Sequence, residues 1–440
     1  MAIGDVTRKR MTGKPKVLLV ADECNPEWPS LPIVGYKYAL EIAKLCDVTL
    51  ATHVRNRENI EKAAPTGLEI VYIDNEWIAS PMFKLARLIR GGEEVGWSTS
   101  MIFNYLPYLA FEHGVWRRFK SQLKGGEFDI VHRITPMSPT LPSWLAHKVP
   151  QPFVIGPLNG NLDWPAAFAA EQAREKEKLR RLRDFYKYLP FARSTYDDAA
   201  AVLSAFSHTR ADLQRVEDAR IVSFPEIGFD PEIFHAKGAK PAGQRSRDGK
   251  IHFLYAGRLV PYKLPELPLH AFAKSDLLKQ HHLHVVGDGP ERARMQMVID
   301  AHDLGDCVTM HGRKTQGEVA DMMREVDAFV FPSIRELGAG VVIESMACGN
   351  HVLVSDYGAP GDLAGRGRGA CVPMADFDGL VAGFRAEMEY CVTDPAAMEA
   401  TAARAQAYAE QGYPWAKKGE KTMEVYHALL DGLPLAGLGY

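Results

Sequence analysis

The chain has 440 residues, of which 46% are hydrophobic and 24% are charged, and its formal net charge is −3. This length exceeds what one ordinary hydrophobic core accommodates, so we expect two domains. The composition is that of a globular protein, the charge does not favour a nucleic-acid-binding protein, and no apolar run is long enough to span a bilayer.

The first 14 residues are polar and basic and contain no apolar stretch. We therefore expect no secretory signal and a cytoplasmic protein. The six cysteines are scattered and include no CxxC pair, which indicates reduced thiols rather than a disulfide framework or a zinc site.

Short apolar runs alternate with longer helical patterns, which predicts parallel sheets covered by helices. In the first half of the chain the predicted strands are 17–20, 48–51, 70–73, 130–131, 153–155, 202–204 and 221–223. Two insertions interrupt this half: an aromatic-rich stretch at 77–119 and a charged helix candidate at 165–195.

The second insertion has eight Lys or Arg residues and four Asp or Glu residues over 171–193, together with one apolar stripe at helical spacing. Two interpretations stay open. The helix either packs on its own domain with a solvated outer face, or it makes a peripheral contact with an anionic membrane, where a lipid-linked acceptor would lie.

Residues 235–250 contain almost no apolar side chains and predict an exposed linker. A second series of predicted strands follows, at 252–256, 283–286, 308–310, 328–331, 352–354 and 370–372. We therefore predict an α/β protein with two doubly wound, Rossmann-like domains, residues 1–230 and 231–415, facing each other across a cleft.

Charged residues follow two predicted strands of the second domain. Arg258 and Lys263 lie in the loop after strand 252–256, where fixed cations suit a diphosphate. Glu336 and Glu344 enclose a glycine-containing turn between strand 328–331 and a predicted helix. A helix N-terminus can face an anion and carboxylates accept hydrogen bonds from hydroxyls, so the combination suggests a nucleotide sugar.

Four blocks in this domain resemble the donor domain of the family 4 retaining glycosyltransferases, over roughly residues 250–415. They are Gly257-Arg258-Leu259-Val260-Pro261-Tyr262-Lys263, Val286-Gly287-Asp288-Gly289-Pro290, Phe331-Pro332-Ser333, and Glu336-x7-Glu344 followed by Met346-Ala347-Cys348-Gly349. The resemblance implies the GT-B fold and sugar transfer from a nucleotide donor. It also implies that the last helix, 416–440, crosses back to the first domain.

The resemblance implies a role for each matching residue. Arg258 and Lys263 would bind the donor diphosphate, Glu336 would hold the transferred sugar and Glu344 the ribose hydroxyls. Further donor contacts are expected from Gly287, Gly289, Arg313, Gly338, Ala339, Gly340 and Val341. Gly287 and Gly289 are equally explained by a turn. Family members often read Glu-x-Phe-Gly where this chain has Glu336-Leu337-Gly338-Ala339, so the sugar pocket is expected to differ in shape.

The first domain offers weaker signals. Gly35, in a loop expected before the first helix, would contact a phosphate or the acceptor. His132, at the end of a predicted strand, matches a histidine near the reacting sugar and is the candidate catalytic residue of this domain, although a structural role is the alternative. Asn159 would line the cleft and contact the acceptor, or form a turn.

We expect no metal and no cofactor other than the co-substrate, with UDP or GDP as its nucleotide. Asp376-Phe377-Asp378 is better explained by a helix cap than by a metal site. The resemblance implies a retaining hexosyltransferase that acts on a glycan or lipid-linked hydroxyl acceptor, with Glu336, His132, Arg258 and Lys263 at the reaction centre. The alternatives are a nucleotide-sugar epimerase of the same fold and a catalytically silent sugar-nucleotide-binding protein. The sugar, acceptor, linkage and oligomeric state are not assigned.

Overall fold

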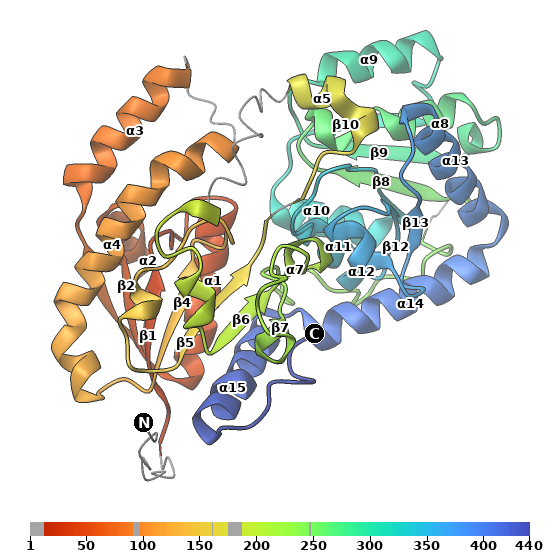
Figure 1. The fold of residues 1–440 in the computed structure, drawn as a ribbon. Coiled ribbons are helices and arrows are strands. Elements are labelled where there is room, and N and C mark those ends of the chain that lie inside the picture. Colours follow the sequence, from red (N-terminus) through yellow and green to blue (C-terminus); the bar gives the residue numbers. More distant parts are fainter. Residues whose placement is uncertain (1–12, 91–96, 161, 175–186, 246–247) are drawn as a thin grey trace.

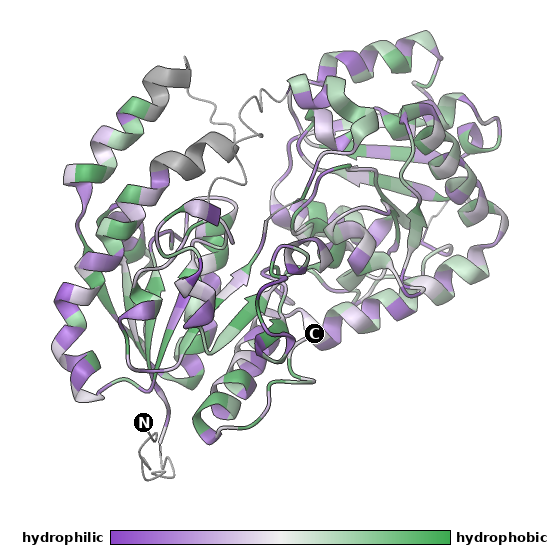
Figure 2. Ribbon diagram, in the orientation of Figure 1, coloured by the Kyte–Doolittle hydropathy of each residue, from purple (hydrophilic) through white to green (hydrophobic). Residues whose placement is uncertain are grey.

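The computed structural model describes residues 13–90, 97–160, 162–174, 187–245 and 248–440. These residues form two parallel sheets, and each sheet is packed between helices, with an apolar core on each of its two faces (Figure 1). Figure 2 shows mostly hydrophobic strands and, beside them, helices that carry both hydrophilic and hydrophobic residues. The predicted fold class is confirmed.

The first sheet has seven strands in the order β3-β2-β1-β4-β5-β6-β7, all parallel. The order reverses between β1 and β4, and the carboxyl ends of strands beside such a reversal form a crevice that usually binds ligands. The strands are β1 (Lys16–Ala21), β2 (Asp47–His53), β3 (Leu68–Ile73), β4 (Ile130–Thr135), β5 (Phe153–Leu158), β6 (Ala201–Ser204) and β7 (Ile221–Ser223). The helices in this part of the chain are α1 (Leu31–Leu45), α2 (Arg57–Ala63), α3 (Glu76–Arg90), α4 (Trp97–Gly125), α5 (Ala169–Arg174), α6 (Ser194–Asp197) and α7 (Ser207–Arg210).

The second sheet repeats this topology with six strands in the order β10-β9-β8-β11-β12-β13, and its reversal lies between β8 and β11. The strands are β8 (His252–Ala256), β9 (His282–Val286), β10 (Val308–Gly312), β11 (Ala328–Phe331), β12 (His351–Ser355) and β13 (Ala370–Val372). The helices are α8 (Leu267–Ala273), α9 (Arg292–Ala301), α10 (Gln316–Glu325), α11 (Gly340–Ala347), α12 (Ala359–Ala364), α13 (Phe377–Thr393), α14 (Pro395–Gly412) and α15 (Trp415–Asp431).

The aromatic-rich insertion forms the helices α3 and α4, which pack against each other beside the first sheet (Figure 1). Phe111 and Phe119 of α4 are buried in the core on that face of the sheet. Trp77 and Phe83 of α3 remain largely exposed. Across the described residues, none of the helices combines the length and the apolar character that crossing a membrane requires.

Residues 162–174 correct the predicted domain division. Trp164 and Phe168 are buried in a core of the second domain, beside β8 and β9, and the Arg174 guanidinium is paired with Glu291 of that domain. The prediction placed this stretch in the first domain because it precedes the boundary predicted at residue 230, and its sequence does not show which core it packs against. The basic helix predicted over 171–193 falls largely on residues 175–186, outside the described residues.

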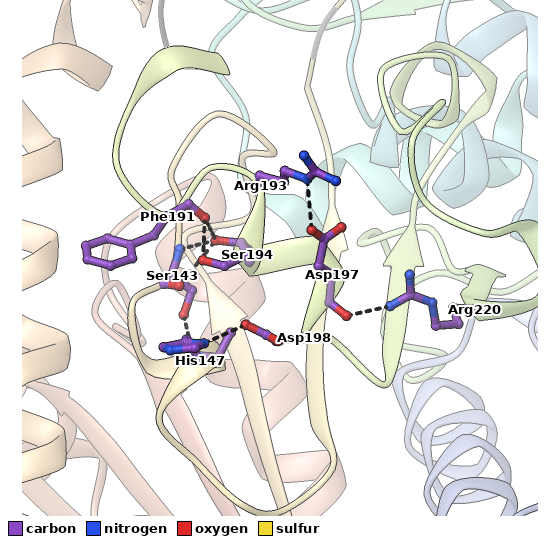
Figure 3. A network of polar contacts seen from close by, with 10 residues as sticks. Ser143, His147, Phe191, Arg193, Ser194, Asp197, Asp198 and Arg220 are labelled. Atoms are coloured by element: carbon purple, nitrogen blue, oxygen red, sulfur yellow. Dashed lines mark hydrogen bonds and ion pairs between the residues drawn. The ribbon is translucent and has the colours of Figure 1, made fainter. Parts of the chain in front are cut away.

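The chain rejoins the first domain at residues 191–198, where polar contacts hold it in place (Figure 3). The Ser143 N–H donates to Thr195 Oγ1 at 2.7 Å, and His147 Nδ1 lies 3.0 Å from Asp198 Oδ2. Arg220 donates to the carbonyl oxygen of Asp197 at 3.2 Å. This segment is therefore fixed to the first domain after its excursion to the second.

The polar stretch at 235–250 is also less exposed than predicted. Arg245 is 8% exposed and donates to the carbonyl oxygens of Cys348 and Gly349, at the end of α11, at 3.0 and 2.6 Å. A guanidinium with five donors satisfies helix-end carbonyls that otherwise lack partners. Polar composition alone therefore misidentified this anchor as solvent-exposed.

Helix α15 leaves the second domain and packs against α1 of the first (Figure 1). Its side chains Trp415 and Tyr426 belong to the apolar core between α1 and the first sheet. The last helix therefore completes the first domain.

Candidate donor-binding site

Lys263 and Glu336 meet at the carboxyl edge of the second sheet, beside the reversal between β8 and β11. Lys263 ends a short 3-10 helix, Pro261–Lys263, after β8, and Glu336 lies in the loop between β11 and α11. The Lys263 ammonium donates a hydrogen bond to Glu336 Oε1, and Ser333 Oγ donates to the same oxygen at 3.2 Å. The side chains of Lys263 and Glu336 are 11% and 14% exposed, so they form a sheltered pair that solvent still reaches.

Two aromatic rings position the Lys263 ammonium, which lies 4.8 Å from the centre of the Phe331 ring and 5.4 Å from that of Tyr262. The negative face of an aromatic ring attracts a cation. The Ile334 N–H donates to the Tyr262 carbonyl at 3.0 Å and ties the loop after β11 to the loop after β8. The two loops therefore hold the ion pair together.

Arg258 provides a second cation on the same loop. Its guanidinium donates to the Tyr262 hydroxyl at 2.7 Å and its side chain is exposed. Tyr262 therefore contacts both basic residues, and the Arg258 fork remains accessible to an anion.

Gly287 and Gly289 let the loop after β9 cross the loop after β8 at close range. Both have positive φ angles, 140° and 156°. A Cβ atom on Gly287 would overlap the Gly257 carbonyl oxygen, and one on Gly289 would overlap that of Leu259. This geometry supports the turn interpretation of both glycines, and a donor contact stays a prediction. Arg313 lies after β10 on the same edge and is exposed.

The loop from Glu336 ends at the N-terminus of α11. Ala339 adopts a left-handed conformation with φ of 53°, and Gly340 and Val341 are the first residues of the helix. Backbone N–H groups in a first helical turn lack helical partners and can donate to an anion or a hydroxyl. The residues predicted to offer backbone contacts therefore follow Glu336 directly in the chain.

Glu344 is on the second turn of α11 and is partly exposed. Burial by the surrounding protein raises its pKa to about 7, and the charge of Lys37 on α1 partly opposes that effect. Glu344 therefore lies where α11 faces the first domain.

Glu226 contacts this site without having given any sequence signal. It follows β7, is 4% exposed, and lies so close to Gly338 that a Cβ atom there would overlap its Oε1 atom. The Asn159 amide donates to Oε1, whereas Oε2 has no hydrogen-bond partner among the described residues. Burial raises the pKa of Glu226 to about 7. A side chain at position 338, where the compared motif often has an aromatic residue, would therefore have to displace this carboxyl group.

A buried lysine accompanies Glu226. Lys418 of α15 donates to the Pro225 carbonyl oxygen, and burial lowers its pKa to about 7. The charge of Lys418 also opposes the increase in the pKa of Glu226. The peptide that links the two domains is thus held by an ionisable group from the last helix.

His132 is placed differently from the catalytic interpretation. Its side chain is fully buried, with Nε2 2.7 Å from the Gly156 carbonyl and Nδ1 2.6 Å from the Tyr426 hydroxyl of α15. Burial lowers its pKa to about 4, so the ring is neutral at neutral pH. This placement supports the structural alternative: His132 fastens α15 to the first sheet.

The structure also changes the interpretation of Gly35 and Asn159. Helix α1 begins at Leu31, with Pro32 in its first turn, so Gly35 lies inside the helix and not in a preceding loop. A Cβ atom at Gly35 would come within 2.9 Å of the Glu23 carbonyl oxygen, which makes close packing its evident role. Asn159 is buried against Glu226.

Asp376 caps α13, because its side chain accepts from the Gly379 N–H at 2.9 Å. Asp378 is paired with Lys274 at 3.1 Å. The DxD motif is thus explained by a helix cap and a surface ion pair.

Residues 237–402 match the family model described as glycosyl transferases group 1. Among curated proteins, the chain is 29% identical over 188 residues to a D-inositol 3-phosphate glycosyltransferase of Arthrobacter sp. (strain FB24), covering 42% of this chain and 44% of that protein. It is 30% identical over 237 residues to the protein of that name from Kineococcus radiotolerans, covering 49% and 53%. The chain thus spans about half the length of these relatives.

Two solved structures share the fold over nearly the whole chain. The sucrose-phosphate synthase of Thermosynechococcus elongatus gives a TM-score of 0.62 at 16% identity, covering 95% of this chain and 100% of that one. Anabaena HepE in complex with UDP gives 0.61 at 14% identity, covering 94% and 100%. The protein therefore has the GT-B fold, and its residues 237–402 match the group 1 glycosyl transferases.

Proposed function

We propose that the protein transfers a hexose-type sugar from a nucleoside diphosphate sugar to a hydroxyl of a glycan or lipid-linked acceptor, with retention of anomeric configuration. The observation that carries the proposal is the Lys263–Glu336 pair, which lies at the carboxyl edge of β8 and β11 within a group 1 glycosyl transferase segment. UDP or GDP is the proposed nucleotide.

In this proposal the two basic residues, Lys263 and Arg258, stabilise the leaving diphosphate. When the bond between the sugar C1 atom and the diphosphate breaks, negative charge grows on the phosphate oxygens, and Lys263 and Arg258 stabilise it. A pre-positioned contact of this kind lowers the activation free energy by on the order of 3 kcal/mol. The acceptor oxygen bonds to C1 on the face that the diphosphate leaves, and its proton passes to the departing phosphate. Because these two cations supply the positive charge, the proposed reaction is metal-independent.

Carboxylates orient the donor in this proposal. Glu336 accepts from hydroxyls of the transferred sugar and remains tied to Lys263, so sugar and phosphate binding are linked. Glu344 accepts from the ribose hydroxyls. The N-terminus of α11 supplies backbone donors between them.

Two variants test the proposal. Glu336→Gln and Lys263→Ala should each lower sugar transfer at least about a hundredfold, because each removes a charge beside the reacting bond. Lys279→Ala, which removes an exposed ammonium near α8, is the matched control and should retain activity. A thermal-shift screen against UDP-, GDP- and ADP-sugars first identifies the donor. Near-normal transfer in either site variant would refute the assignment.

Product analysis separates the alternatives. An epimerase would return a changed nucleotide sugar without using an acceptor, and a silent binding protein would be stabilised by the donor without turning it over.

We also propose a peripheral contact with the inner face of the cell membrane. It is supported by Trp77 and Phe83, which are 74% and 59% exposed on α3 next to Lys84. Co-sedimentation with anionic vesicles tests this contact. Equal sedimentation of the wild type and a Trp77→Ser, Phe83→Ser variant would contradict it.

A further inference from the structure

A pocket of about 440 Å³ lies between the two domains and contains none of the residues assigned above to the donor. Its walls come from the segment after β5, from α7, and from the loop and helix after β12. A volume of this size falls within the range of small-molecule sites. We call it the interdomain pocket.

Two connections place the interdomain pocket next to the donor site. Gly358, in its wall, packs so closely that a Cβ atom there would lie 2.7 Å from the Glu336 carbonyl oxygen, and the Ala359 N–H donates to that oxygen at 3.2 Å. On the other side, His208 Nε2 lies 3.4 Å from Asn159 Oδ1, and Asn159 contacts Glu226 beside Gly338. A molecule in the pocket therefore lies beside the loop that carries Glu336.

Both domains must be in place for the pocket to exist. The Ser207 N–H donates to Asp362 Oδ2 at 2.8 Å, and the Tyr357 hydroxyl donates to the Asp163 carbonyl oxygen at 2.9 Å. The first bond joins α7 to α12 of the second domain, and the second bond holds residues 162–174 against the loop after β12 within the second domain. A ligand held here would contact α7 on one side and segments of the second domain on the other.

The charges of the lining indicate which ligands fit. Among the described residues, ten line the pocket; three of these are aspartates, namely Asp163, Asp356 and Asp362, and none of these ten is a lysine or an arginine. His208 does not supply a positive charge, because burial lowers its pKa to about 4. Carboxylates accept from hydroxyls and attract ammonium groups, whereas they repel phosphate.

We propose that the interdomain pocket binds the acceptor and selects a polyhydroxylated ring without a phosphate group, with an amine strengthening binding. This inference rests on the proposed transferase function and names its acceptor class. It also distinguishes the chain from the relatives whose names specify a phosphorylated inositol.

The test uses three six-membered carbocycles that differ mainly in charge: 2-deoxystreptamine, myo-inositol and 1D-myo-inositol 3-phosphate. Each is titrated calorimetrically into the full chain in the presence of UDP. We expect the diamine to bind most tightly and the phosphate at least about tenfold more weakly, since like charges at close range oppose binding. Tightest binding by the phosphate, or no binding by any of the three, would overturn the proposal.

A charge reversal in the lining provides the matched comparison. Asp356 is exposed in the pocket wall, and Asp356→Lys should lower the affinity of the diamine about tenfold or more and improve that of the phosphate. Asp276→Lys makes the same change on a fully exposed residue outside the pocket and should leave the order unchanged. An unchanged order in Asp356→Lys would overturn the inference.

Binding is measured here without catalysis, so the two proposals fail separately. If no donor is turned over but the ranking of the three compounds and its reversal are observed, the transferase proposal fails and only the ligand preference of the pocket stands. If donors are turned over and the phosphate is the preferred compound, the assignment of the pocket fails alone.

Discussion

His132→Phe tests whether this histidine has a structural rather than a catalytic role. The substitution keeps a planar ring but removes both nitrogens, so the Gly156 carbonyl and the Tyr426 hydroxyl lose their partner. Leaving buried polar groups without partners should lower the free energy of unfolding of the first domain by roughly 2–4 kcal/mol. The double variant His132→Phe, Tyr426→Phe should recover part of this loss, because both polar groups of the second contact are then absent.

The pKa of His132 gives the same experiment a pH dependence. Burial lowers this pKa from 6.5 to about 4. The free energy of unfolding is therefore about 3 kcal/mol higher above pH 6.5 than below pH 4, as far as this residue determines it. As the pH falls below 6.5, the unfolded chain takes up a proton that the folded chain refuses, so this contribution is lost towards pH 4. The stability difference between the wild type and His132→Phe should therefore shrink by roughly 2 kcal/mol between pH 7 and pH 4.5.

Hydrogen exchange of peptides from β4 and α15 is the appropriate measurement, because it reports the stability of the first domain separately from that of the second. Sugar transfer by the folded variant should fall less than about tenfold, whereas loss of a general acid or base costs about 10²–10⁴. Normal protection from exchange combined with a hundredfold loss of transfer would refute the structural role.

Two further predictions concern Glu226 and the DxD motif. Gly338→Ala should reduce sugar transfer about tenfold or more, because the new methyl group overlaps the Glu226 carboxyl, and adding Glu226→Ala should restore part of the loss; no restoration in the double variant would contradict the contact. Asp376→Ala should lower stability by about 1 kcal/mol through loss of the α13 cap, with transfer unchanged and insensitive to EDTA; a metal-dependent loss of transfer in this variant would instead assign the motif to a metal site.

The proximity of Lys263 and Glu336 could be predicted from the sequence because the segments that carry them are local. Each of the blocks around Lys263 and Glu336 is one strand followed by one loop, and the parallel topology brings such loops to a common edge. The spacing within a block also fixes which side chains reach that edge. The predicted strands were confirmed for the same reason, since runs of buried Val, Ile and Leu indicate strands independently of distant contacts.

The features that escaped prediction depend on contacts between distant segments. Glu226 is buried by Asn159 and by the loop that carries Gly338, and the residues next to it in the sequence do not predict these two contacts. Arg245 lies in a stretch whose polar composition is typical of a linker, but its guanidinium caps the C-terminal end of α11. Gly35 was predicted before α1 because residues 32–36 resemble a glycine-containing loop of the family, whereas the helix begins at Leu31, with Pro32 in its first turn, and Gly35 packs tightly against Glu23.

The exchange of segments between the domains bears on how this protein is made. The first domain contains side chains of α15, Trp415 and Tyr426, in its core, and the second contains Trp164 and Phe168 from the first half of the chain. When β1 to β7 have left the ribosome, α15 has not yet been synthesised. The apolar face of α1 that α15 covers is therefore exposed to solvent until synthesis ends. In a chimaera that joins residues 1–230 of one parent to the remainder of another, each domain core would combine side chains from both parents. Cuts that move α15 together with the first domain, and residues 162–174 together with the second, would keep each core within one parent.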